Sequence, residues 1–67
     1  MTPEEREWKA YYRFEVRDDQ GVMLDSDLIK GKRSAISRAK ISCERQEGKK
    51  WFVYNLENEV VDSATSP

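Results

Sequence analysis

Residues 8–17 read WKAYYRFEVR, and this stretch decides the fold because its apolar and polar side chains alternate. A period of two residues is typical of a strand that turns one face to a core. We therefore predict a β-strand here. Its core side would consist of every second residue: Trp8, Ala10, Tyr12, Phe14 and Val16.

A turn signal follows at residues 18–21, which read DDQG. Acidic residues favour the start of a turn, and Gly21 readily adopts a left-handed backbone. We expect a hairpin whose second strand covers residues 22–29. That strand would turn one set of residues to the core and the other away from it: Val22, Leu24, Ser26 and Leu28 inward, and Met23, Asp25, Asp27 and Ile29 outward.

Residues 33–47 have a helix-forming composition and stop before Gly48, a residue typical of a helix C-cap. At about 100° per residue, a stripe of mostly small residues recurs on one side of this helix. Small side chains let a helix approach a sheet closely, so we expect Cys43 to be buried rather than reactive. The stripe consists of Ala35, Ile36, Ala39, Ser42 and Cys43.

Two further strands are expected after the helix, over residues 51–56 and 59–63, joined by a turn at Glu57 and Asn58. We place Phe52, Tyr54 and Leu56 on the core side. The 67 residues allow one domain at most. A chain this short buries only about 60% of the surface that its unfolded form exposes. The predicted fold is an α+β domain over residues 1–67, in the order β-β-α-β-β, with one helix on an antiparallel sheet and frayed ends at 1–6 and 64–67.

The composition argues against catalysis. The chain has one cysteine and no histidine, which removes the usual zinc ligand sets and every nucleophile or base that depends on histidine. We expect no enzyme activity, no cofactor and no metal. A single cysteine, an N-terminus without a signal peptide and the absence of a long apolar run predict a cytoplasmic protein without a membrane span.

Part of the chain resembles the repeat unit of the small bacterial YegP-like family. The resemblance covers about fifty residues and depends on the segments YRFEV at 12–16, LDSDLI at 24–29 and KRSA at 32–35, with Gly21 at the turn. The run YNL at 54–56 is similar to the start of a following repeat. Ile29 stands where that family usually has an aromatic residue. The resemblance implies a fold and no catalytic or binding residues.

The sheet face away from the helix is the first candidate site. One helix cannot cover both faces of a sheet, and exposed apolar patches usually mark association surfaces. An alternative is that residues 1–7 fold over this face, or that strand twist takes some of its residues into the core. The alternation predicts that the following apolar residues lie there: Tyr11, Met23, Ile29, Trp51, Val53 and Val61.

The basic segment at residues 30–50 is the second candidate site, with eight basic and two acidic side chains. Phosphate contacts are expected from Lys32, Arg33, Arg38 and Arg45 if the partner is nucleic acid. Ile41 lies between Arg38 and Arg45 on the polar side of the helix, where it suits the centre of a small protein-binding spot.

The favoured function is a non-catalytic protein-interaction module, either a homodimer through the open sheet face or a domain that docks on a larger protein. Two alternatives stay open: nucleic-acid binding through residues 30–50, and a phage-encoded inhibitor of a host complex, such as an anti-CRISPR protein. The small size, the high charge and the absence of catalytic motifs are compatible with all three.

Overall fold

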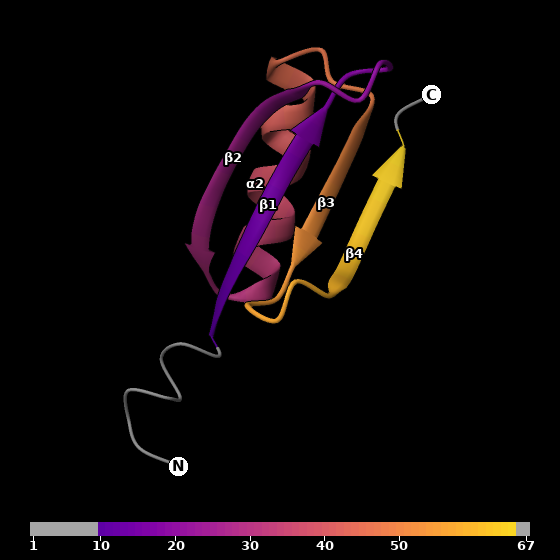
Figure 1. Ribbon diagram of the computed structural model, residues 1–67. Coiled ribbons are helices and arrows are strands. Elements are labelled where there is room, and N and C mark those ends of the chain that lie inside the picture. The colour runs from indigo at the N-terminus through magenta and orange to yellow at the C-terminus, as the bar shows by residue number, and fades with distance from the viewer. Residues whose placement is uncertain (1–9, 66–67) are drawn as a thin grey trace.

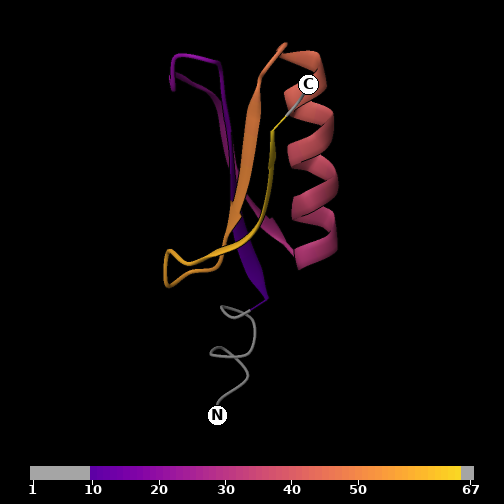
Figure 2. The ribbon, with the colours of Figure 1, turned by 90° about the vertical axis from the view of Figure 1, so that its right-hand side faces the viewer.

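A computed structural model describes residues 10–65. The elements follow the order β1 (Tyr11–Arg17), β2 (Met23–Lys30), α2 (Lys32–Arg45), β3 (Lys50–Tyr54) and β4 (Val60–Thr65) (Figure 1). The four strands form one antiparallel sheet in the order β2-β1-β3-β4, and α2 lies on one face of it only (Figure 2). The predicted α+β fold and its element order are confirmed.

The core lies between α2 and the two central strands. β1 contributes Phe14 and Val16, as its alternation predicts, and the helix stripe of small residues faces them. Cys43 is buried, as expected for a small side chain on the side of the helix that faces the sheet. Partly buried residues, among them Tyr12, Leu24 and Ile36, extend this core toward its margins.

The predicted orientation of β3 is wrong. Val53 lies directly opposite Phe14, and Trp51 lies opposite Val16. Directly opposed residues project from the same face of a sheet, so Trp51 and Val53 belong to the core and not to the open face. Trp51 is 6% exposed and Val53 is fully buried. Because both sides of β3 are apolar, alternation alone could not distinguish them.

A β-bulge in β2 makes part of the prediction for this strand wrong, because it changes which residues face the core. Val16 pairs with Asp25 but Arg17 pairs with Met23, which leaves Leu24 as an extra residue. An extra residue shifts the alternation by one position. Leu24 packs on the core as predicted, but beyond the bulge Ile29 packs there, and Leu28 is exposed on the opposite face.

A second bulge, in β4, makes the predicted face of one residue in this strand wrong. Val53 pairs with Asp62 while Tyr54 pairs with Val60, so Val61 is the extra residue and packs on the core instead of the open face. β4 also continues to Thr65, whereas residues from 64 onward were predicted to fray. The predicted fraying of residues 1–6 lies outside the described residues.

The two hairpin loops have the same hydrogen-bond pattern. In the first, Asp18 Oδ1 accepts hydrogen bonds from the backbone N–H groups of Gln20 and Val22, both at 2.9 Å. In the second, Asn55 Oδ1 accepts hydrogen bonds from the backbone N–H groups two and four residues later in the chain, again both at 2.9 Å. The fourth loop residue has a positive φ in both, 83° at Gly21 and 63° at Asn58. Asparagine tolerates this backbone, so the second loop forms without glycine.

The C-terminus of α2 differs in detail from the predicted glycine cap. Glu47, and not Gly48, takes the left-handed conformation, with φ 55°. The Gly48 N–H donates to the Cys43 carbonyl at 2.8 Å, which completes a Schellman motif. Gly48 is buried, and a Cβ at this position would lie 2.6 Å from Val16 Cγ1. Glycine is required here for close approach to β1.

Candidate functional site

The sheet face turned away from α2, called the open face below, carries three rows of residues that are set by strand register. Each row crosses the strands in the order β2, β1, β3, β4, and opposed residues share the face. The middle of the face is polar and aromatic, and apolar side chains lie at its margins. The rows are Leu28–Arg13–Tyr54–Val60, Ser26–Glu15–Phe52–Ser63 and Met23–Arg17–Lys50–Thr65.

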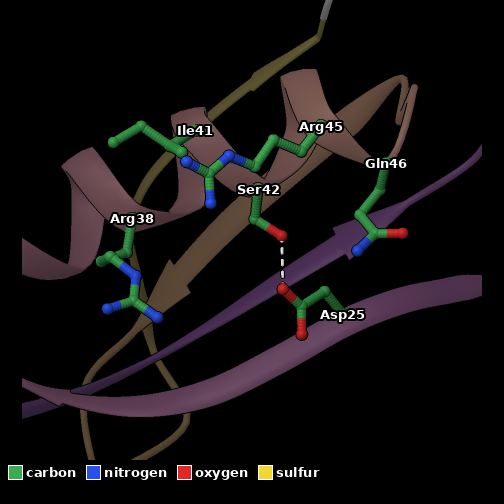
Figure 3. Close-up of a pocket in the computed structure, with 6 residues that line it drawn as sticks. All are labelled: Asp25, Arg38, Ile41, Ser42, Arg45 and Gln46. Atoms are coloured by element: carbon green, nitrogen blue, oxygen red, sulfur yellow. Dashed lines mark hydrogen bonds between the residues drawn. The ribbon is translucent and has the colours of Figure 1, made fainter.

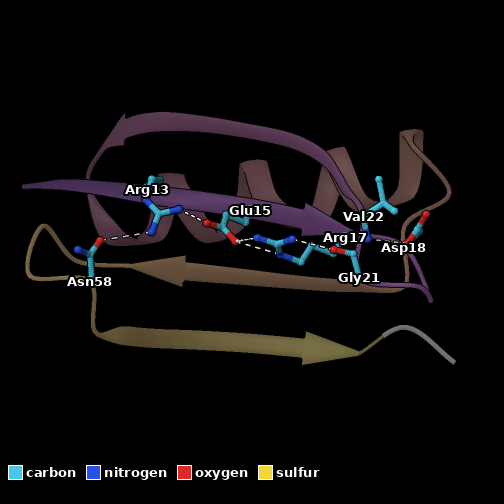
Figure 4. Close-up of polar contacts among 7 residues, drawn as sticks. All are labelled: Arg13, Glu15, Arg17, Asp18, Gly21, Val22 and Asn58. Atoms are coloured by element: carbon cyan, nitrogen blue, oxygen red, sulfur yellow. Dashed lines mark hydrogen bonds and ion pairs between the residues drawn. The ribbon is translucent and has the colours of Figure 1, made fainter.

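A chain of polar contacts runs along β1 and joins the two hairpin loops (Figure 4). Glu15 is its centre and forms ion pairs with both Arg13 and Arg17. Arg17 donates to Glu15 Oε1 through Nε at 3.2 Å and Nη2 at 2.9 Å, and to the Gly21 carbonyl through Nη1 at 2.7 Å. At the other end, Arg13 Nη2 donates to Asn58 Oδ1 at 3.4 Å. Both arginines are thereby fixed between the sheet and a loop.

Glu15 is buried although it lies on the sheet face opposite α2, with 6% of its surface exposed. Burial alone would raise its pKa. The hydrogen bonds from Arg13 and Arg17, together with their charges, outweigh burial and hold the pKa of Glu15 below its ordinary value. Glu15 is therefore ionised at neutral pH and orients both arginines.

Two aromatic rings complete the centre of the open face. The Arg13 guanidinium lies over the Tyr54 ring, 4.4 Å from its centroid, in a cation–π contact. The Phe52 ring is 6.2 Å from that of Tyr54 and tilted by 31°. Both rings were predicted in the core. The alternation of β1 predicts that Arg13 and Glu15 lie on the open face. Only the register between β1 and β3 shows which aromatic rings lie beside them.

Exposed apolar side chains border this centre. Leu28 on β2 is 47% exposed and Val60 on β4 is 53% exposed, at opposite ends of one row. Met23 is exposed in the third row. Of the five predicted interface residues, Tyr11 and Met23 lie on the open face, whereas Trp51, Val53 and Val61 belong to the core.

Both edge strands have aspartates that bond the following backbone N–H. The Ser26 and Leu28 N–H groups donate to the side chains of Asp25 and Asp27 at 2.9 and 2.8 Å. Gly31 N–H donates to the Ala10 carbonyl across the hairpin, so by the alternation of an antiparallel ladder the Ser26 and Leu28 amides point outward. On β4, Ser63 N–H bonds the Asp62 side chain at 2.9 Å. These contacts occupy donors that a further strand would need.

The helix surface carries the second predicted site. Arg38, Ile41 and Arg45 come together with Asp25, Ser42 and Gln46 around a groove of about 120 Å³ between α2 and β2 (Figure 3). The Ser42 hydroxyl donates a hydrogen bond to Asp25 Oδ2 across it. Lys32 and Arg33, which were predicted with this group, are exposed in the first turn of α2 and do not line the groove.

Within residues 10–65, the structure was compared with two other kinds of site, a metal centre and a membrane span, and fits neither. No group of three or more histidine, cysteine, aspartate or glutamate side chains suited to a metal ion occurs in that range. None of its helices has the length and apolar character of a membrane span. No protein-family model, curated protein or solved structure matches the chain. The resemblance to the YegP-like family therefore stays a prediction.

Proposed function

We propose that this chain is a non-catalytic protein-interaction module whose contact surface is the open face. The observation that carries the proposal is the arrangement of Arg13, Phe52 and Tyr54 at the centre of the sheet face opposite α2. Arginine and aromatic side chains are enriched in the cores of protein interfaces and among their energetic hot spots. Leu28 and Val60 add exposed apolar contacts on either side.

The order already present on this face favours binding. A flexible side chain that becomes fixed in an interface costs about 0.5–1.5 kcal/mol. Arg13 is held by Glu15, Tyr54 and Asn58, and Arg17 is held by Glu15 and Gly21. Because both arginines are fixed before a partner arrives, much of that cost is met during folding.

The edge aspartates argue for contact through the face rather than by strand addition. A partner that extends a sheet must pair with outward backbone N–H groups. On β2 those of Ser26 and Leu28 are already bonded to Asp25 and Asp27, whose charges also oppose an incoming strand. These contacts favour the open face over the β2 edge as the contact surface.

The partner in this proposal is a protein, either a second copy of the chain or a larger host protein, with phage-encoded inhibition as one setting for the latter. Sedimentation equilibrium between low and high protein concentration separates the two cases. A dimer that dissociates in the Tyr54→Ala variant supports self-association through the open face. A monomer at all concentrations directs the search to another protein.

Affinity capture with matched variants tests the proposed surface. Tyr54→Ala removes a ring from the open face, and Arg33→Ala removes an exposed charge from α2 as a control. We expect mass spectrometry to identify a partner that wild type and Arg33→Ala retain and Tyr54→Ala loses, and purified components to reproduce that difference. Equal retention by all three folded proteins would contradict the proposal.

A further inference from the structure

We propose that the groove between α2 and β2 is a second binding site, which takes a carboxylate side chain from an acidic peptide segment of a partner. The groove lies on the helix side of the β2 edge, away from the open face, so it can bind a ligand independently of the function proposed for that face. It is lined by Asp25, Arg38, Ile41, Ser42, Arg45 and Gln46.

The helix places the groove's donors on one side. Arg38, Ser42 and Arg45 are spaced by four and then three residues, which brings them to one side of an α-helix. Figure 3 shows them with Gln46 around the space above Asp25. Two guanidinium groups and an amide can therefore reach one small acceptor.

The charges of this groove are unbalanced. Both ion pairs recorded among residues 10–65 belong to Glu15, so neither Arg38 nor Arg45 has a carboxylate within 4.0 Å in that range. The one acid in the groove is already engaged, because Asp25 accepts hydrogen bonds from the Ser42 hydroxyl and the Ser26 N–H. Two cations face one anion, so the net positive charge of the groove attracts a further negative group.

The surroundings favour a carboxylate on a peptide over a nucleic-acid backbone. Guanidinium groups bind both carboxylates and phosphates with two parallel hydrogen bonds, so the residues beside the arginines decide between the two. Ile41, 44% exposed, offers an apolar contact for the methylenes of a glutamate side chain. Asp25 and Asp27 lie along the adjacent β2 edge and would repel a continuous polyanion. A single carboxylate between the arginines avoids that repulsion.

A ¹⁵N NMR titration with an acetylated, amidated peptide that carries one glutamate flanked by glycines tests this site, and the same peptide with glutamine in place of the glutamate is the uncharged comparison. We expect saturable shifts centred on Ile41, Ser42 and Gln46 that weaken as salt is added. Arg38→Ala and Arg45→Ala should each weaken binding at least fivefold. Arg33→Ala, an exposed cation of the same helix outside the groove, should leave binding within twofold of wild type.

Asp25→Asn should strengthen binding to the groove, whereas the arginine variants should weaken it. Asparagine can still accept the Ser42 hydrogen bond but carries no charge, so the single-glutamate peptide should bind this variant several-fold more tightly than wild type. Three results would overturn the proposal: no shifts at low salt, equal losses for Arg33→Ala and Arg38→Ala, or tighter binding of a hexathymidine oligonucleotide at the same residues. The last result would assign the groove to phosphate groups instead.

Discussion

The two faces of the sheet carry similar numbers of aromatic rings but differ in what surrounds them. On the covered face, Trp51 and Val53 pack against the small residues of α2. On the open face, Phe52 and Tyr54 lie beside a buried carboxylate and two ordered arginines. Neighbouring residues of one strand thus serve different purposes. Exclusion of water stabilises the first face, and ion pairs with cation–π contacts order the second.

The largest expected effect is a difference in the loss of stability between two neighbouring residues of β3. Trp51→Ala should lower the free energy of unfolding by about 3–5 kcal/mol, because it leaves a cavity beneath α2. Phe52→Ala should cost less than half as much, since its ring is half-buried on the open face. Urea denaturation followed by circular dichroism measures both. Equal losses, or a larger loss for Phe52→Ala, would contradict the assignment of the faces.

The next effect concerns the close approach of the chain to β1 on the covered side. Gly48→Ala should destabilise by about 1–3 kcal/mol, because its Cβ would lie 2.6 Å from Val16 Cγ1 and 3.2 Å from Cys43 Sγ. Glu47→Gly, one residue earlier, should instead stabilise by up to about 1 kcal/mol by relieving a left-handed non-glycine backbone. Thermal unfolding of both variants checks the opposite signs, and a stable Gly48→Ala protein would refute the tight contact.

The third effect tests the polar chain of the open face by pH. The pKa of Glu15 is lowered in the folded state, so its stabilising contribution is fully present above the ordinary carboxyl pKa. That contribution is lost as pH falls through the lowered pKa. Glu15→Gln should be about 1–2 kcal/mol less stable than wild type at neutral pH, and the gap should shrink in acid. Urea midpoints across pH 2–7 measure the gap, and a constant difference would exclude a role for the charge.

The smallest effect on stability concerns the β2 edge. Asp27→Ala should change the free energy of unfolding by no more than about 0.5 kcal/mol, because Asp27 is exposed. It also frees the Leu28 N–H for pairing with another chain. Sedimentation velocity should show concentration-dependent association of Asp27→Ala, while Asp27→Asn, which keeps an acceptor, should associate less. Identical behaviour of the two variants would contradict the role assigned to this contact.

The parts of the fold that were predicted correctly depend on local patterns. The alternation of residues 8–17 assigns β1, the DDQG turn leads into β2, and the stripe with Ala39 and Cys43 gives the buried side of α2. Each of these signals lies within one element and its immediate neighbours, so no knowledge of pairing is needed.

The errors arise where pairing between strands decides the outcome. Residues 51–54 are apolar on both sides, and only register with Phe14 and Val16 orients them. The bulges at Leu24 and Val61 invert the alternation beyond them, and no residue type in those strands marks the extra position. In the polar chain, the spacing of Arg13, Glu15 and Arg17 is visible in the sequence, but its contacts with the two loops are not.

An alanine scan of β3 with two readouts tests the central claim most directly. Trp51, Phe52, Val53 and Tyr54 are replaced one at a time, and both the free energy of unfolding and the partner captured per folded molecule are measured. The two-face account predicts alternation: Trp51 and Val53 variants lose stability but keep capture, whereas Phe52 and Tyr54 variants keep most stability but lose capture. Loss of both properties at the same residues would contradict the account.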